Sequence, residues 1–349
     1  MALLAVSRDL ADLRRRLGEI TIGKTFAGEP VTAEMIRAAG SMTVLLKDAI
    51  KPNLVQTLEG QPALLHCGPF ANIAHVNNSL VADRIGLKLG DYVVTEGGFA
   101  SDLGMEKFMN IVCRAGGLRP SAVVLVATAQ ALEHHGGEPG GGPAAIERGA
   151  ANLERHINIV KSFGISPVVA VNRFPGDTDE EVHLVRRLAL EFGAHAAELN
   201  EGFEKGGVGA TALAEAVVDA ADQPIAFRNT YELDAPIDAK ITAIAKTIYG
   251  ADGVVFQPAA QARIAEFAAA GYGNLPICMA KTHMSLSDDP TKYCAPTGFD
   301  VTIRDLRAYT GAGWLVALLG EMQTMPGLGA EPAAFNIDID AAGNTVGLF

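Results

Sequence analysis

The chain has 349 residues, which is enough for two or three domains with full-sized hydrophobic cores. Hydrophobic residues make up 49% of the sequence and charged residues 19%, a composition that excludes a disordered protein. The 28 Lys and Arg residues against 40 Asp and Glu give a net charge of -12, which argues against nucleic-acid and membrane-surface partners.

The cysteines and the first residues of the chain indicate the cellular compartment of the protein. The 4 cysteines lie far apart, without a CxxC pair or the Cys and His spacing of a zinc site. Residues 1–6 form a short apolar run with no basic region, so they do not predict a signal peptide. The most apolar stretch, residues 122–132, is too short to span a bilayer. These features predict a cytoplasmic protein with reduced thiols.

The first part of the chain predicts short elements. Residues 8–17 carry leucines at helical spacing and predict a helix that ends at Gly18. Residues 20–22 predict a short strand and residues 28–30 a turn. Residues 32–42 predict a helix, because Thr at the first position is a good helix cap.

The middle of the chain alternates short apolar runs with amphipathic helices. The runs are Val- and Leu-rich and do not alternate with polar residues, which is typical of buried parallel strands. We expect strands at residues 63–67, 92–96, 122–128 and 167–172, and helices at 179–192 and 210–221. This order predicts βαβ units around a mostly parallel sheet over residues 60–222, with a glycine-rich loop at 136–143.

A Pro- and Asp-rich segment at residues 222–238 separates this block from a C-terminal section of mixed pattern. There we expect a strand at 253–256, a helix at 258–270, and strands at 276–280, 299–304 and 313–319. The C-terminal section is therefore predicted to be α+β.

Residues 18–25 match the P-loop pattern GxxxxGK[ST] letter for letter. A working P-loop follows a buried strand and opens a helix, whereas here a charged helix precedes the motif and a turn follows it. We therefore expect a chance match. A self-contained NTPase that uses Lys24 is the corresponding alternative.

Polar and aromatic loop residues follow several of the predicted strands. Segment 68–79 combines glycine with amide side chains, and the glycines of segment 95–104 permit close backbone approach. Ligands bind at the carboxyl edge of open α/β sheets. Phe99, Phe174 and Phe203 lie in three such loops. Each alone is more often a core residue, but on one edge they predict a slot for a flat ring.

Two further groups of polar residues have side chains suited to binding a phosphate or a metal. Lys281, Asp288 and Asp289 form a polar cluster after a predicted strand, which suits either phosphate contact or a solvated turn. The 8 histidines lack the spacing of a metal site. We therefore predict no protein-bound metal.

These segments, in this order, resemble the formate–tetrahydrofolate ligase family. The matching stretches are residues 39–59, 68–75, 95–108, 152–157, 276–290, 324–328 and 336–349, and the resemblance runs from Met1 to Phe349. The family's P-loop lies upstream of the segment that matches residue 1. The chain thus resembles the C-terminal majority of such a ligase.

The resemblance implies an α/β fold, with a mostly parallel, P-loop-NTPase-like core truncated at its N-terminus and a C-terminal α+β domain. It implies three regions: 1–153, the remainder of the nucleotide and formyl-phosphate domain; 154–248, an α/β folate-site domain; and 249–349, the α+β domain. The family joins formate to tetrahydrofolate with ATP, through formyl phosphate, and yields 10-formyltetrahydrofolate. ATP with Mg²⁺, an optional monovalent cation and a homotetramer are also implied.

Site residues carry over by position. The implied folate site consists of Phe99, Gly104, Phe174, Pro175, Leu199 and Phe203, with the pterin stacked between Phe174 and Phe203. The family usually has Trp where this chain has Phe203. The implied formyl-phosphate and nucleotide vicinity consists of Asn72, His75, Lys281 and Asp288.

Several residues depart from the family pattern. Gln130 and Glu133 replace a usual Arg and Lys, and Cys67 and Val76 replace glycines. Together with the missing P-loop, these changes leave two alternatives to an active ligase. One is a split enzyme in which another polypeptide supplies the P-loop, and the other is a non-catalytic folate-binding remnant.

Overall fold

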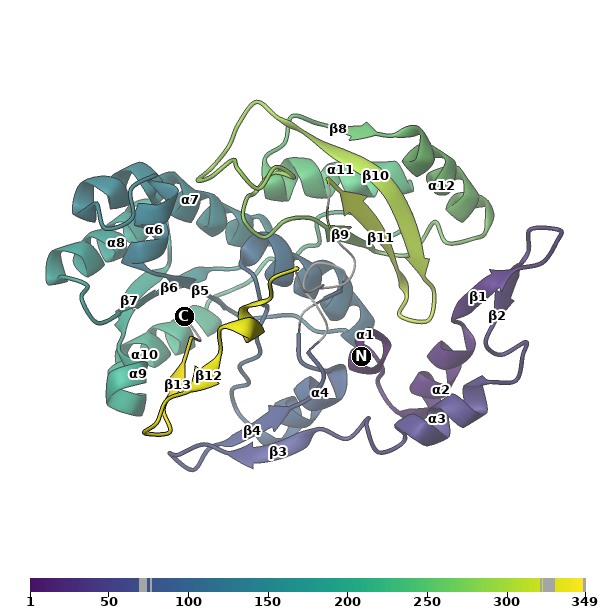
Figure 1. Cartoon of the computed structure of the whole chain (residues 1–349), viewed down its shortest axis with the longest axis horizontal. Helices are drawn as coiled ribbons and strands as arrows, with labels where there is room; N and C mark the ends of the chain where they lie inside the picture. The colour runs from purple at the N-terminus through teal and green to yellow at the C-terminus, as the bar shows by residue number, and fades with distance from the viewer. Residues whose placement is uncertain (69–73, 76, 321, 323–329, 348–349) are drawn as a thin grey trace.

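The computed structural model describes residues 1–68, 74–75, 77–320, 322 and 330–347. Three parts are arranged side by side in Figure 1: a parallel sheet with helices, a mixed sheet, and an N-terminal part of short helices and hairpins. Within the described residues, no helix combines the length and the apolar character that crossing a membrane requires. The mixed α/β architecture agrees with the predicted fold class.

The parallel sheet has the strand order β5-β6-β7. Its strands are β5 (Val123–Ala127), β6 (Pro167–Asn172) and β7 (Ala196–Asn200), joined by α6 (Ala129–His135), α7 (Gly142–Ser162) and α8 (Asp179–Glu191), and followed by α10 (Thr211–Ala221). The predicted strands at 122–128 and 167–172 and both predicted helices are confirmed. A capping box between Thr178 and Glu181 begins α8 where the sequence predicted its start.

The C-terminal sheet is mixed, with the order β8-β10-β11-β9. Its strands are β8 (Gly253–Phe256), β9 (Ile277–Ala280), β10 (Asp300–Tyr309) and β11 (Trp314–Leu319), accompanied by α11 (Ile237–Ile244) and α12 (Pro258–Ala269). β10 and β11 are antiparallel, whereas both outer pairs are parallel. All residues of β9 and β11 are buried, and the α+β prediction is confirmed.

Two separate hydrophobic cores share one helix. The smaller core fills the space between the parallel sheet and α6, α7 and α8, and the larger one surrounds the mixed sheet. Ile146 and Ile157 of α7 belong to the smaller core, whereas Ile159 and Val160 belong to the larger. Helix α7 therefore joins the two cores.

The N-terminal part differs from one prediction. Its elements are α1 (Ala2–Ala5), α2 (Leu10–Gly18), β1 (Thr21–Lys24), β2 (Pro30–Thr32) and α3 (Ala39–Leu46). The predicted helix over 32–42 is wrong, because residues 33–37 form turns and Arg37 has a φ of 60°. β1 and β2 form an antiparallel hairpin, so residues 18–25 end a helix and enter a strand. The P-loop letters are a chance match, as expected.

Two predicted buried strands are wrong. Residues 63–67 contribute only β4 (Pro62–Leu65), which pairs antiparallel with β3 (Asn53–Gln56) in an exposed two-stranded hairpin. Residues 92–96 are extended, with Tyr92 58% and Val94 88% exposed, and pair with no strand in the described part of the chain. A buried parallel strand needs a parallel partner and cover on both faces. β4 has only the antiparallel partner β3, and residues 92–96 have no strand partner in the described chain.

The remaining elements are short. They are α4 (Leu80–Leu89), the π-helical turns η1 (Ser101–Met105), η2 (Phe108–Val112) and η4 (Ala245–Tyr249), α5 (Cys113–Gly116), α9 (Gly202–Lys205), the 3-10 turns η3 (Gly206–Ala210) and η5 (Ala333–Phe335), and the hairpin strands β12 (Asp338–Ile339) and β13 (Thr345–Val346). Segment η1–η2–α5 runs from the site described below into the larger core.

Candidate functional site

Strands β6 and β7 end side by side, and an aromatic residue follows each end. The Nδ2 of Asn200 donates a hydrogen bond of 2.8 Å to the Oδ1 of Asn172, which ties the two strand ends together. Phe174 lies two residues beyond β6 with 45% of its surface exposed, and Phe203 lies three residues beyond β7 with 97% exposed. The prediction that these two aromatics lie at one carboxyl edge is confirmed.

A tight turn presents Phe174 to solvent. The backbone N–H of Phe174 donates to the Oδ2 of Asp177 at 2.8 Å, and the N–H of Asp177 donates back to the carbonyl of Phe174 at 3.1 Å. Pro175 and Gly176 form the exposed tip, and Gly176 has a φ of 103°, which favours glycine. The ring is therefore available to a ligand and is not used in the core.

Phe203 projects from the short helix α9. The N–H of Glu201 donates to the carbonyl of Gly209 at 3.0 Å, and a Cβ at Gly209 would lie only 2.5 Å from the Glu201 carbonyl oxygen. This close approach folds residues 201–209 back on themselves and leaves Phe203 at the surface. Leu199, in β7, is half-buried against the smaller core.

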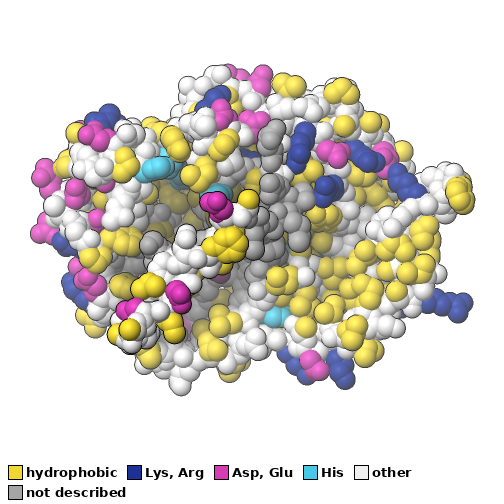
Figure 2. Space-filling model, viewed as in Figure 1, with side chains coloured by type: hydrophobic (Ala, Val, Ile, Leu, Met, Phe, Trp, Pro, Cys, Tyr) yellow, Lys and Arg dark blue, Asp and Glu magenta, His cyan; other side chains and the backbone are white. Residues whose placement is uncertain are grey.

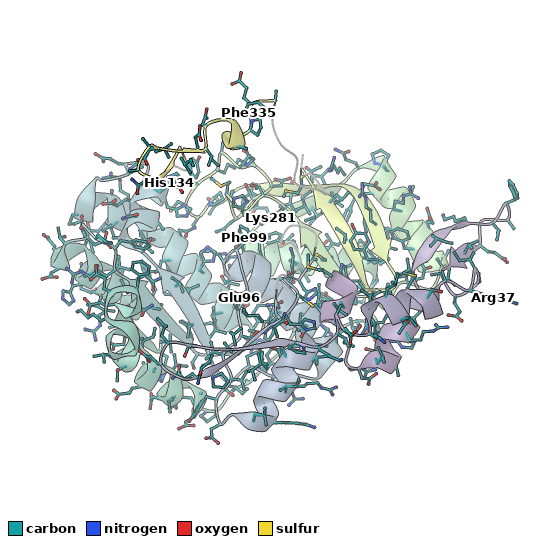
Figure 3. All side chains as sticks on the ribbon, turned by 60° about the horizontal axis from the view of Figure 1, so that its bottom comes forward. Arg37, Glu96, Phe99, His134, Lys281 and Phe335 are labelled. Carbon is teal, nitrogen blue, oxygen red and sulfur yellow. The ribbon has the colours of Figure 1, made fainter. Side chains whose placement is uncertain are left out.

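Phe99 lies in a different kind of segment. The sequence placed it after a strand, but residues 91–98 of the structure form no strand. Phe99 instead belongs to a turn that leads into η1, and its ring lies 5.3 Å from the ring of His283. Figure 3 places Phe99 and Lys281 close together near the middle of the molecule, far from Arg37 at its edge.

Gly104 lies beneath this turn. A Cβ at Gly104 would lie 1.9 Å from the carbonyl oxygen of Gly98 and 2.5 Å from the carbonyl carbon of Gly97. The turn at Gly97–Gly98 thus packs directly on the α-carbon of Gly104, which is why the position requires glycine. Gly104 thus contributes to the site by allowing this close packing of the turn.

A cavity of about 370 Å³ lies between this turn, the edge strand β5 and the loop after β9. Its polar lining includes Ser101, Asp102, His135, Asn152 and His156. Strand β5 lines it along its whole length, from Val123 to Ala127, together with Thr128, so the cavity lies against the edge strand of the parallel sheet. Ligand-sized cavities of this kind are the usual places for small-molecule binding.

His75 is fully buried, and Asn72 lies outside the described residues. Burial lowers the pKa of His75 to about 3, so the imidazole is neutral at physiological pH. Neither of its ring nitrogens has a hydrogen-bond partner among the described residues. Its ring meets the ring of Trp314 edge-on, with 5.3 Å between centroids.

Lys281 and Asp288 do not form a solvated turn. Lys281 is completely buried, and its Nζ lies 2.9 Å from the Oδ2 of Asp102. Asp288 is half-buried, and its Oδ2 accepts a 2.8 Å hydrogen bond from the backbone N–H of Thr302 in β10. The structure therefore does not bring Lys281 and Asp288 together as one exposed cluster; each is held by its own partners.

Of the residues that depart from the family pattern, the structure describes Glu133, Cys67 and Gln130. Glu133 is buried at the end of α6 and accepts hydrogen bonds of 3.0 and 2.8 Å from the N–H groups of Gly140 and Gly142, so it anchors the glycine-rich loop. Cys67 has a φ of 63°, a conformation that favours glycine. Gln130 is exposed, and Val76 lies outside the described residues.

Sequence reasoning missed the roles of three residues that line the cavity: Ser101 and Asp102, which are buried, and His156, which is half-buried. The Oγ of Ser101 lies 2.7 Å from the Nδ1 of His156. Burial lowers the pKa of His156, the effect of the neighbouring Asp102 carboxylate being smaller. No local motif marks this pairing, because its members lie in distant parts of the sequence.

Comparison with known proteins identifies the relatives of this chain. The family model for formate–tetrahydrofolate ligase matches residues 1–349. The chain belongs to the formate–tetrahydrofolate ligase family. It is 53% identical to the formate–tetrahydrofolate ligase of Desulforamulus reducens and 52% identical to that of Saccharopolyspora erythraea, in each case over 100% of this chain.

The formate–tetrahydrofolate ligases that match are longer than this chain. The alignments cover 64% of the length of those two bacterial proteins. The chain is also 50% identical, over its full length, to 39% of human cytoplasmic C-1-tetrahydrofolate synthase. The chain thus corresponds to part of each of these proteins.

Proposed function

We propose that the chain is the tetrahydrofolate-binding part of a formate–tetrahydrofolate ligase. Membership in the family supports the reaction class, and one observation carries the assignment of the folate site. That observation is the pair Phe174 and Phe203, exposed at the ends of adjacent strands of one sheet. Exposed aromatic rings stabilise a flat, partly apolar ligand by stacking, and the pterin of tetrahydrofolate is such a ligand.

The family reaction needs positioning more than covalent chemistry from the protein. An oxygen of formate attacks the terminal phosphorus of ATP, ADP leaves, and formyl phosphate forms. A folate nitrogen then attacks the formyl carbon, phosphate leaves and the nitrogen loses its proton. Holding two anions in line and presenting the acyl phosphate to the folate supply most of the acceleration. In our proposal, the aromatic pair and the cavity beside β5 hold the folate in this second step.

Exposed apolar segments support the proposal that the nucleotide-binding core is incomplete here. Leu65, Tyr92 and Val94 are each more than half exposed, in the two segments whose patterns predicted buried strands. Figure 2 also shows hydrophobic side chains gathered over α2, α3 and the β1–β2 hairpin. Exposed apolar patches of this kind mark interaction surfaces. We propose that the part of the relatives not matched here covers such segments and completes a P-loop-NTPase-like core.

The other implied features also remain proposals. We propose 1–153, 154–248 and 249–349 as functional regions of the sequence, with helix α7 crossing the first boundary. We also propose a homotetramer and a cytoplasmic location like that in the human relative's name. Asn72, His75, Lys281 and Asp288 are proposed to lie near the formyl phosphate and nucleotide. Among the described residues, no group of three or more His, Cys, Asp or Glu side chains is placed to hold a metal ion. Mg²⁺ with ATP and an optional monovalent cation are part of the proposal, and neither is assigned ligands here.

Binding of tetrahydrofolate by the purified chain and its Phe203→Ala variant tests the assignment. Removing one stacking face should weaken binding about tenfold, since an aromatic pair contributes about 0.5–1.5 kcal/mol beyond area burial. Phe26→Ala is the matched control, because Phe26 is equally exposed in the distant β1–β2 hairpin. Equal affinity in all three proteins would refute the folate site.

Product formation from ATP, formate and tetrahydrofolate tests the reaction itself. A chain that makes 10-formyltetrahydrofolate alone holds a complete nucleotide site. A chain that binds tetrahydrofolate but makes product only after addition of a P-loop-bearing polypeptide is one subunit of a split ligase. Absence of product with either preparation would leave a folate-binding remnant and refute the ligase assignment.

A further inference from the structure

The turn that carries Phe99 has an unusual backbone. Phe99 has a φ of 60°, and Ala100, directly after it, has a φ of 66° and a ψ of -179°. The second conformation is adopted almost only by glycine, because a Cβ collides with the backbone there. Two consecutive strained residues persist only where the surroundings determine the conformation.

Two polar contacts follow the strained residues immediately, the first partly buried and the second buried. The Oγ of Ser101 lies 2.7 Å from the Nδ1 of His156 on α7. The Oδ2 of Asp102 lies 2.9 Å from the Nζ of Lys281, and the two side chains are only 7% and 0% exposed. The turn is therefore fixed to α7 on one side and to the end of β9 on the other.

The contacts of Lys281 fix the facing loop as well. Its ammonium also donates to the carbonyl of Thr282 at 2.8 Å and to the carbonyl of Ser285, and it lies 5.1 Å from the centre of the Tyr249 ring. Asp102 and the two carbonyls accept from all three of its N–H groups. Lys281 thus ties the turn at Phe99 to the loop that carries His283, whose ring contacts Phe99.

We propose that Asp102 and Lys281 are a positioning pair, which holds the strained turn so that Phe99 faces the tetrahydrofolate site. This inference rests on the proposed function and gives Lys281 an indirect role, through the turn. A buried ion pair adds little net stability, because desolvation of the two charges offsets their attraction. Here the pair instead holds residues 99–102 in a single conformation. Without the pair, the strained backbone would relax to another conformation.

A double variant separates positioning from folding. Lys281→Met alone would leave the Asp102 carboxylate buried without its partner and would destabilise the chain. Asp102→Leu combined with Lys281→Met removes both charges at similar volume, so the chain should still fold. Its unfolding temperature should be somewhat lower than that of the wild type, because the carbonyls of Thr282 and Ser285 lose their donor. We expect this double variant to bind tetrahydrofolate about tenfold more weakly.

Adding Ala100→Gly to the double variant is the decisive step. Glycine adopts the conformation of residue 100 without strain, so it should restore affinity to within about threefold of the wild type. Wild-type affinity in the double variant, or a weakened affinity that Ala100→Gly does not restore, would refute the positioning role. A purely structural contribution would not be rescued by glycine.

A ligand-free measurement distinguishes this proposal from the proposed function. In a chain labelled with fluorophenylalanine, the fluorine resonance of Phe99, assigned with Phe99→Leu, reports the contact with the His283 ring. We expect the resonance to move in the double variant and to return with Ala100→Gly. An unmoved resonance refutes the positioning pair even if the wild type binds tetrahydrofolate. A moved resonance in a chain that binds no tetrahydrofolate supports the pair and refutes the proposed function.

Discussion

Gly104 offers the sharpest test of how the site is built. An added Cβ would lie 1.9 Å from the Gly98 carbonyl oxygen, whereas ordinary contacts begin near 3.4 Å, so the two backbones must separate by about 1.5 Å. Overpacking costs typically about 1–3 kcal/mol, and backbone on both sides puts Gly104→Ala at the upper end. At about 2–4 °C per kcal/mol, the unfolding temperature should fall by about 6 °C or more.

Calorimetry of Gly104→Ala beside Gly40→Ala checks this reasoning. Gly40 lies exposed in α3 with nothing within 4 Å of an added Cβ, so its replacement should leave the unfolding temperature unchanged or slightly higher. Gly104→Ala should also weaken tetrahydrofolate binding, because the turn that carries Phe99 must move. A Gly104→Ala chain as stable as the wild type would refute the close packing of the turn.

Two further substitutions test ligand stacking at Phe203 and the effect of the buried Asp83 carboxyl group on stability. Phe203→Trp enlarges the stacking surface and should strengthen tetrahydrofolate binding about threefold in titration calorimetry; weaker binding would contradict stacking at this position. Burial raises the pKa of Asp83 to about 6, above the value of about 3.9 in an unfolded chain, so the folded chain loses stability as the pH rises from about 4 to about 6. Asp83→Asn should therefore raise the unfolding temperature at pH 7 and have no effect below pH 4, and a lower temperature at pH 7 would show that the carboxylate is stabilised.

The sequence predicts those elements whose pattern reflects burial inside the chain itself. β6, β9 and β11 are apolar and are covered by other parts of this chain, so local pattern and structure agree. Residues 63–67 and 92–96 have the same apolar character, but the described chain leaves their side chains half-buried or exposed. Periodicity shows that a segment is suited to burial and does not show which polypeptide buries it.

The site was predictable in part for a similar reason. Phe174 and Phe203 follow directly on strands, so the rule that parallel strands end at one edge brought them together. Asp102 and Lys281 are far apart in the sequence and follow different elements, and nothing in the spacing indicates their contact. The strain at Ala100 was equally hidden, because alanine has no turn preference that would signal a positive φ.

Helix α7 limits how the chain can be divided experimentally. It has 21 residues and is about 30 Å long, with residues from Ile146 to Ile157 in one core and Ile159 and Val160 in the other. A fragment boundary at residue 153 would cut it and expose apolar side chains on both pieces. Fragments intended for crystallisation or NMR should therefore keep residues 142–162 whole, even where only one of the two sheets is wanted.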